Sequence, residues 1–205
     1  MRFRIATAAI SLIIICLTIG TIFWYQEGQY LLPTPLPKDY ATVNPGEIIS
    51  TDSSILPNAR SSPALFHFFS PDCPCSRFNL KHFLALKKKY TAIKFYAVVT
   101  DKEKASSARK MLDDDIIVLV DRDKRLAKAC GVYSTPQAAI LQANNTLFFR
   151  GNYNRARYCT DKNSNFVQMA LDSLVAKKGP PQFNSLATSS YGCALSENDE
   201  SIAIR

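Results

Sequence analysis

The sequence predicts an α/β protein with a central mixed sheet flanked by helices, carried behind one N-terminal transmembrane helix. Three observations lead to this prediction: an uncharged apolar stretch at the N-terminus, alternating strand and helix patterns from about residue 61, and a hairpin followed by a helix at the end of that pattern. Strands that alternate with helices along a chain indicate a sheet with helices on both faces.

The first 24 residues are interpreted as a cytoplasmic n-region and a membrane anchor. Residues 5–24 carry no charge, and this length is enough for a helix to cross a bilayer. Arg2 and Arg4 precede the stretch and the next basic residue is Lys38, so the positive-inside rule exports everything beyond the anchor. We therefore expect a single-pass protein of a bacterial inner membrane with its C-terminal domain in the periplasm. A cleaved signal peptide is the competing interpretation, although no small-x-small cleavage site follows the apolar stretch.

The net charge of +8 is the kind of charge that suits a nucleic-acid partner, but export of the domain argues against one. Lys87, Lys88 and Lys89 end an amphipathic helix, where cations complement the helix dipole. A solvated basic face that leans on anionic lipid headgroups of the inner membrane is the better interpretation.

The exported part divides into three segments. Residues 25–60 are rich in proline and polar residues and form a semi-rigid spacer. Residues 61–178 form the folded domain, and residues 179–205 form an irregular tail that opens with Gly-Pro-Pro. Within the domain the expected strands are 64–69, 93–99, 116–120, 137–142 and 146–150, and the expected helices are 74–90, 102–112, 123–130 and 164–177.

The stretch Cys73-Pro74-Cys75-Ser76 stands where the first strand gives way to the first helix of the domain. Pro74 suits the first helical position, because its fixed φ fits and its missing N–H is not needed there. The unpaired N–H groups and positive dipole end of the helix favour a thiolate at Cys73 or Cys75. The motif therefore predicts redox or metal chemistry.

Five of the six cysteines lie beyond the anchor: Cys73, Cys75, Cys130, Cys159 and Cys193. An odd number in an oxidising compartment leaves at least one thiol over, or bound to a metal or a partner. A structural bridge between Cys159 and Cys193 that staples the tail is the simplest interpretation. It leaves Cys73, Cys75 and Cys130 as the functional set.

The order of elements, with cysteines at the first strand–helix junction, resembles the thioredoxin fold. The loop 130–137, in which Val132 precedes Thr135-Pro136, is similar to the loop of that superfamily whose proline is cis and lies beside the active-site cysteines. The resemblance covers about residues 61–178 and is strongest to membrane-anchored, exported thioredoxin-like or redoxin proteins. It implies a cis peptide bond before Pro136, with Thr135 offering backbone groups to an extended substrate.

The sequence departs from the thioredoxin pattern at its cysteines. If Cys73 aligns with the first cysteine, Ser76 occupies the place of the second and Cys75 is an extra thiol. A bond between Cys73 and Cys75 would close a small, strained ring, and strained disulfides are oxidising and labile. Cys130, six residues before Pro136, is the best candidate for an additional resolving thiol.

His67, six residues before Cys73, matches the position at which many thioredoxins bury a carboxylate beneath the active site. A histidine there can relay protons if its pKa is near working pH. The structural alternative is a core histidine bonded to a backbone carbonyl.

The leading hypothesis is a thiol–disulfide oxidoreductase in which Cys73 attacks a substrate disulfide and Cys75 or Cys130 resolves the mixed disulfide. Its expected partners are protein thiols and disulfides and a membrane or periplasmic electron-transfer protein, and no cofactor is expected. A metal-binding protein or copper metallochaperone is the alternative, because soft thiolates at Cys73 and Cys75 suit copper(I), with His67 or Cys130 as a further ligand.

A peroxiredoxin-like peroxidase is a further alternative. Ser70-Pro71-Asp72-Cys73 fits the Ser/Thr-x-x-Cys ending of the peroxidase motif. Phe66 stands where that motif has a proline, which makes peroxidase chemistry the weaker hypothesis.

Overall fold

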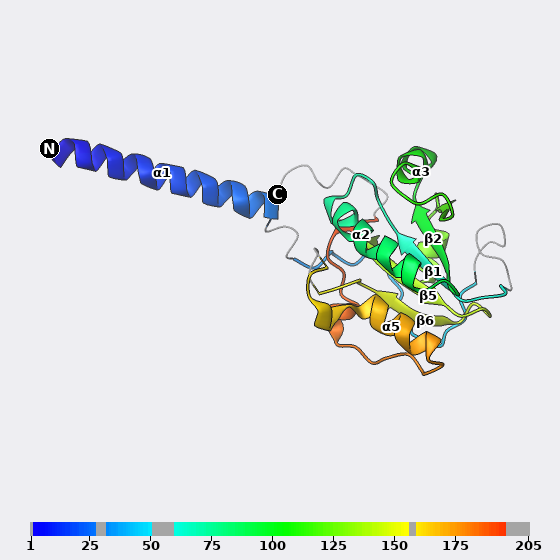
Figure 1. Cartoon of the computed structure of the whole chain (residues 1–205). Coiled ribbons are helices and arrows are strands. Elements are labelled where there is room, and N and C mark those ends of the chain that lie inside the picture. Colours follow the sequence, from blue (N-terminus) through cyan, green and yellow to red (C-terminus); the bar gives the residue numbers. More distant parts are fainter. Residues whose placement is uncertain (1, 28–31, 51–59, 156–158, 196–205) are drawn as a thin grey trace. The chain divides into compact units, whose positions relative to one another are not determined.

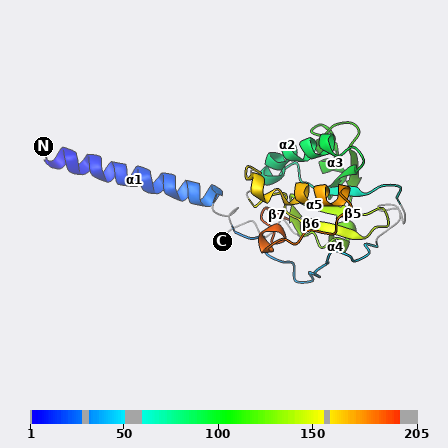
Figure 2. The same ribbon diagram turned by 60° about the horizontal axis from the view of Figure 1, so that its bottom comes forward.

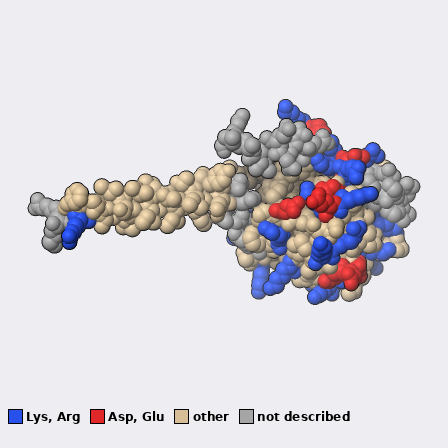
Figure 3. Space-filling view, turned by 90° about the horizontal axis from the view of Figure 1, so that it is seen from above, with Lys and Arg blue, Asp and Glu red and all other residues tan. Residues whose placement is uncertain are grey.

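The computed structural model describes residues 2–27, 32–50, 60–155 and 159–195. The chain divides into two compact units, Met1–Pro33 and Thr34–Arg205. The first contains helix α1 (Arg2–Glu27), of which Phe3–Gln26 is long and apolar enough to cross a membrane. By length and composition this helix can be a membrane anchor or a signal sequence. Figure 3 shows that the surface of this helix is uncharged along most of its length, with a basic residue (blue) near one end.

The second unit is built on a five-stranded mixed sheet with the order β3-β2-β1-β5-β6 (Figure 1). Strands β1 (Ala64–Phe68), β2 (Lys94–Val99) and β3 (Ile117–Val120) are parallel. Strands β5 (Gln137–Leu141) and β6 (Leu147–Gly151) form a hairpin, and β5 is antiparallel to β1. The central strands β1 and β5 are buried along their whole length, as expected for strands covered on both faces.

Helices cover the two faces of the sheet unequally. The larger core lies under α2 (Pro74–Lys89), α3 (Lys102–Arg109) and α5 (Phe166–Val175), and contains alternate strand residues such as Leu65. The smaller core contains the intervening residues, such as Phe66, and packs against α4 (Arg125–Ala129). Figure 2 shows α2 above the strands and α4 below them. This topology confirms the fold class: the fold is thioredoxin-like.

Residues before 61 and after 178, outside the predicted domain, also pack against the folded unit. Ile48 bridges to Thr146, and Ile49 is buried in the smaller core. The backbone N–H of Thr34 donates to the carbonyl of Ser190 over 2.7 Å, which ties the start of the unit to its end. Two single-turn 3₁₀ helices and one small sheet complete the described fold: η2 (Lys162–Ser164), η3 (Ser185–Ala187), and β4 (Ser134–Thr135) with β7 (Cys193–Ala194).

Candidate functional site

Cys73 lies at the point where α2 begins. It is the N-cap residue, with an extended backbone, and Pro74 follows at the first helical position. The first turn of α2 holds no acidic residue and the last turn holds three lysines, so the helix places its positive end at Cys73 with no opposing charge of its own. Ser76, in the place of the second thioredoxin cysteine, instead accepts a hydrogen bond from the Ser70 N–H over 3.2 Å.

The loop before β5 lies against this helix end. The Thr135–Pro136 peptide bond is cis, and the Thr135 carbonyl oxygen lies 3.7 Å from the Cys73 sulfur. Strand β4 pairs with β7 in antiparallel register, with Thr135 opposite Cys193. The last strand of the described chain is therefore aligned along the loop that faces Cys73.

Cys73 and Cys193 form a disulfide, with 6.2 Å between their Cα atoms. The predicted bridge between Cys159 and Cys193 therefore has to be corrected, because Cys193 is bonded elsewhere and Cys159 keeps its thiol. The reason is the register of β7, which sets Cys193 opposite Thr135 and so beside the Cys73 sulfur. Cys75 takes no part in this bond, and its side chain is completely buried on the inner face of α2.

Gly192 allows the C-terminal tail to approach the backbone of Thr135 closely. Its φ is +132°, and a Cβ at this position would collide with the carbonyl oxygen of Thr135. The Thr34 hydroxyl donates to the Gly192 carbonyl over 3.1 Å and holds the other side of the strand. Gly192 was not among the predicted site residues, and a glycine directly before a cysteine is the only sequence signal that pointed to it.

Cys130 lies on the other face of the sheet from α2. It is completely buried at the C-terminal end of α4 and belongs to the smaller core, with Phe66 and Leu126. Burial raises its pKa, and the neighbouring Asp121 carboxylate raises it further. The structure therefore does not bring Cys130 to the Cys73 disulfide, although Pro136 is only six residues further along the chain.

His67 is completely buried on β1, stacked on Phe83 with 4.3 Å between the ring centroids. Its Nδ1 shares a hydrogen bond of 2.9 Å with the Tyr153 hydroxyl, so its partner is a phenol and not the backbone carbonyl of the structural alternative. Burial lowers the pKa of His67 to about 3. The expectation of a pKa near working pH is therefore wrong, because an apolar interior disfavours the charged imidazolium.

Metal ligands do not gather in the described part of the chain. Among residues 2–27, 32–50, 60–155 and 159–195, no group of three or more His, Cys, Asp or Glu side chains is arranged to hold a metal ion.

Comparisons with known proteins give the fold and the family. No curated protein matches the chain. A hypothetical protein from Sinorhizobium meliloti 1021 is similar in structure, with a TM-score of 0.61 at 17% identity over 76% of this chain and 96% of that one. An uncharacterized conserved protein from Geobacillus kaustophilus is similar with a TM-score of 0.60 at 16% identity, over 81% of this chain and 99% of that one. A family model described as a domain of unknown function (DUF6436) matches residues 47–195, which span the sheet, the cis loop and both cysteines of the disulfide, and the chain belongs to this family.

Proposed function

We propose that the second unit is a thiol–disulfide oxidoreductase whose redox pair is Cys73 and Cys193. The observation that carries the proposal is the disulfide between these residues, closed at the N-terminal end of α2 and beside the cis-proline loop. A helix N-terminus stabilises a thiolate, and a stabilised thiolate is both a nucleophile and a good leaving group. Cys193 thus takes the resolving role that the sequence suggested for Cys75 or Cys130.

The reaction begins with both cysteines reduced. The Cys73 thiolate attacks a disulfide of a substrate protein, forms a mixed disulfide and releases one substrate thiolate, which takes up a proton. The Cys193 thiolate then attacks the Cys73 sulfur and releases the second substrate thiolate. Two electrons pass from the cysteine pair to the substrate, and the reverse sequence oxidises a substrate dithiol.

The position of β7 suggests how the substrate is admitted. In the oxidised state β7 pairs with the backbone of Ser134 and Thr135, the groups that an extended substrate segment would use. Substrate and tail therefore compete for β4, and the site opens when Cys193 is released from Cys73.

The setting proposed for this chemistry is the periplasmic side of a bacterial inner membrane. Helix α1 serves as an uncleaved single-pass anchor, because basic residues precede its apolar stretch and none follows until Lys38. Protein thiols and disulfides are the substrates, and a membrane or periplasmic thiol protein exchanges electrons with the pair.

The test uses reduced full-length protein in detergent micelles and glutathione disulfide as the probe. Wild-type protein should convert each glutathione disulfide to two glutathione molecules and close the Cys73–Cys193 bond. The double variant Cys75→Ser/Cys193→Ser, in which neither thiol can resolve the mixed disulfide, should stop at a glutathione adduct on Cys73, and Cys73→Ser should lose the reaction. Cys130→Ser is the matched control and should behave as wild type. Complete turnover by Cys75→Ser/Cys193→Ser without an adduct, or full activity of Cys73→Ser, would overturn the proposal.

A further inference from the structure

We propose that Cys75 and Cys159 form a second redox pair, the inner pair, which exchanges electrons with Cys73 and Cys193, the outer pair. The proposal rests on the proposed function, because the outer pair is the inner pair's route to a substrate. It names a second site that the thioredoxin resemblance does not contain.

The two cysteines of the inner pair lie at the buried face of α2. Cys75, Asn79 and Phe83 follow one another at intervals of four residues and are buried on that face. The Asn79 side-chain amide donates to the Cys159 sulfur over 3.0 Å. Side chains four apart on a helix lie on the same face with Cβ atoms about 5–6 Å apart, so Cys75 is the next residue along this face from the side chain that binds the Cys159 sulfur. A disulfide requires the Cys159 sulfur to move from Asn79 to Cys75, one turn nearer the start of α2.

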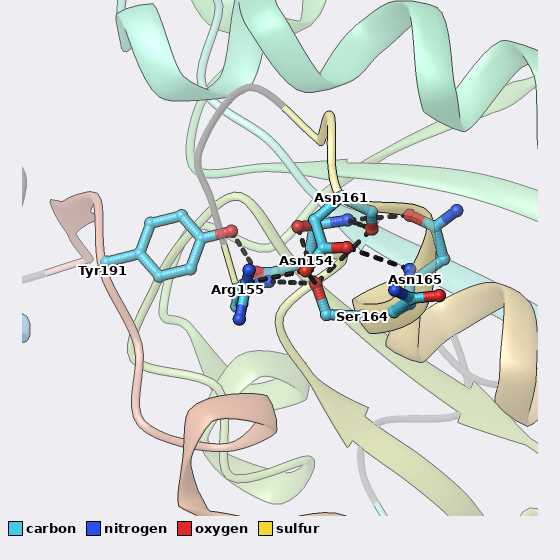
Figure 4. Close-up of polar contacts among 7 residues, drawn as sticks. Asn154, Arg155, Asp161, Ser164, Asn165 and Tyr191 are labelled. Carbon is cyan, nitrogen blue, oxygen red and sulfur yellow. Dashed lines mark hydrogen bonds and ion pairs between the residues drawn. The ribbon is translucent and has the colours of Figure 1, made fainter.

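Residues that precede and follow Cys159 in the sequence are hydrogen-bonded to one another (Figure 4). The Asn154 amide donates to the Asp161 carbonyl over 2.6 Å and to the Asn165 side chain over 2.7 Å. The Ser164 hydroxyl donates to the Asn154 side-chain oxygen over 3.0 Å. These bonds hold Asn154, Asp161, Ser164 and Asn165 together as a platform that begins two residues after Cys159 on one side.

Tyr191 connects this platform to the outer pair. It stands two residues before Cys193, and its hydroxyl donates to the Asn154 carbonyl (Figure 4). Burial raises the pKa of Tyr191 most, and the charges that Cys159 and Cys75 carry as thiolates raise it further. Tyr191 therefore lies near both thiols.

The inner pair also resolves the odd number of exported cysteines. The outer pair uses two of the five cysteines beyond the anchor and the inner pair uses two more. The fifth, Cys130, belongs to the smaller core on the other face of the sheet. Four cysteines thus serve redox chemistry at one end of α2, and one fills a core.

Exchange between the pairs needs no outside oxidant. The Cys75 thiolate attacks the Cys73 sulfur, and Cys193 leaves as a thiolate. The Cys159 thiolate then attacks the Cys75 sulfur, and Cys73 leaves. One inner disulfide forms as the outer one breaks, two electrons move to the outer pair, and the two thiol protons follow them. Burial raises the pKa of Cys159 to about 11, so the second step is slow at neutral pH and accelerates as the pH rises.

The test titrates full-length protein in detergent micelles with mixtures of reduced and oxidised glutathione. After an acid quench, a mass-tagged maleimide labels the remaining thiols and peptide mapping assigns them. We expect the tags to fall from six to four and then to two, and the last two to map to Cys16 and Cys130. Cys159→Ser should lose only the second step, whereas the matched control Cys130→Ser should keep both.

Tags on both Cys75 and Cys159 under oxidised glutathione alone, with the outer disulfide closed, would overturn the inner pair and leave the proposed function standing. Glutathione held on Cys75 as a stable adduct would also overturn it. Failure of the outer disulfide to form under the same conditions would instead contradict the proposed function. The wild-type map decides between these results without relying on the folding of any variant.

Discussion

Cys73 and Cys130 are both buried cysteines at helix ends, yet their surroundings favour opposite chemistry. Cys73 caps the N-terminal end of α2, where the N–H groups and dipole favour a thiolate. Cys130 ends α4, at the negative end of a helix, in an apolar core and near the Asp121 carboxylate, so its pKa is raised. The comparison teaches that the face of the sheet and the end of the helix, not distance along the chain, decide which cysteine can react.

The largest expected effect is the difference in alkylation rate between these two cysteines. In the reduced, folded protein Cys73 should react with iodoacetamide about 1,000-fold or more faster than Cys130, because Cys130 becomes accessible only when its core opens. Quenched time courses with peptide mapping measure both rates in one sample. In concentrated denaturant the two rates should converge, and a similar convergence in the folded protein would break the comparison.

The second prediction concerns the pH dependence of stability that results from burial of His67 beneath α2. The folded pKa of His67, about 3, lies below the unfolded value of about 6.5, so below pH 6.5 the unfolded chain binds a proton that the folded one does not. The stability that depends on neutral His67 is therefore fully present above pH 6.5. It is lost progressively as the pH falls from about 6.5 towards 3. Between about pH 7 and pH 4 the loss should be on the order of 3 kcal/mol.

Denaturant unfolding at these two pH values measures that loss. His67→Phe should show a clearly smaller loss than wild type, since phenylalanine cannot be protonated. An equal loss in the variant would show that His67 does not carry the pH dependence.

The third prediction tests how β7 holds the outer pair together. A Cβ at Gly192 would collide with the Thr135 carbonyl, so Gly192→Ala should weaken the β4–β7 pairing and let dithiothreitol reduce the disulfide about tenfold faster. Gly179→Ala is the matched control, because nothing lies within 4 Å of that position. Equal reduction rates for the two variants would show that the strand pairing does not protect the disulfide.

The sequence was sufficient for the fold because the strands and helices carry strong periodic patterns and the cis-proline loop has a recognisable order of residues. It was not sufficient for the disulfide. The pairing of Cys193 with Cys73 depends on two strands of two residues each, and such short strands leave no pattern. The expectation for Cys130 is wrong because its position six residues before Pro136 in the sequence does not bring it to the same face of the sheet as α2. The pKa of His67 follows from burial of β1 on both faces, which its position before Cys73 did not reveal.

The smallest expected effect concerns Asn79. Its hydrogen bond to the Cys159 sulfur lowers the pKa of that thiol, against the larger effect of burial. Asn79→Ala should therefore raise the pKa of Cys159 and slow its alkylation a few-fold at pH 9, with little change at Cys73. The exposed Asn163 offers a control variant, Asn163→Ala, that should leave both rates unchanged. A faster reaction in Asn79→Ala would mean that the asparagine acts by covering the sulfur.

The most direct test of the Cys73–Cys193 pair is a disulfide map of the full-length protein, acid-quenched and alkylated before purification. Trypsin leaves Cys73 and Cys75 in one peptide, residues 61–77, and Cys193 in another, residues 179–205. Fragmentation on the N-terminal side of Pro74 separates the two candidate sulfurs in the first peptide. We expect the linked peptides to be joined through Cys73 and Cys193. A linkage of Cys193 to Cys159, or a bond between Cys73 and Cys75 with Cys193 alkylated, would contradict it.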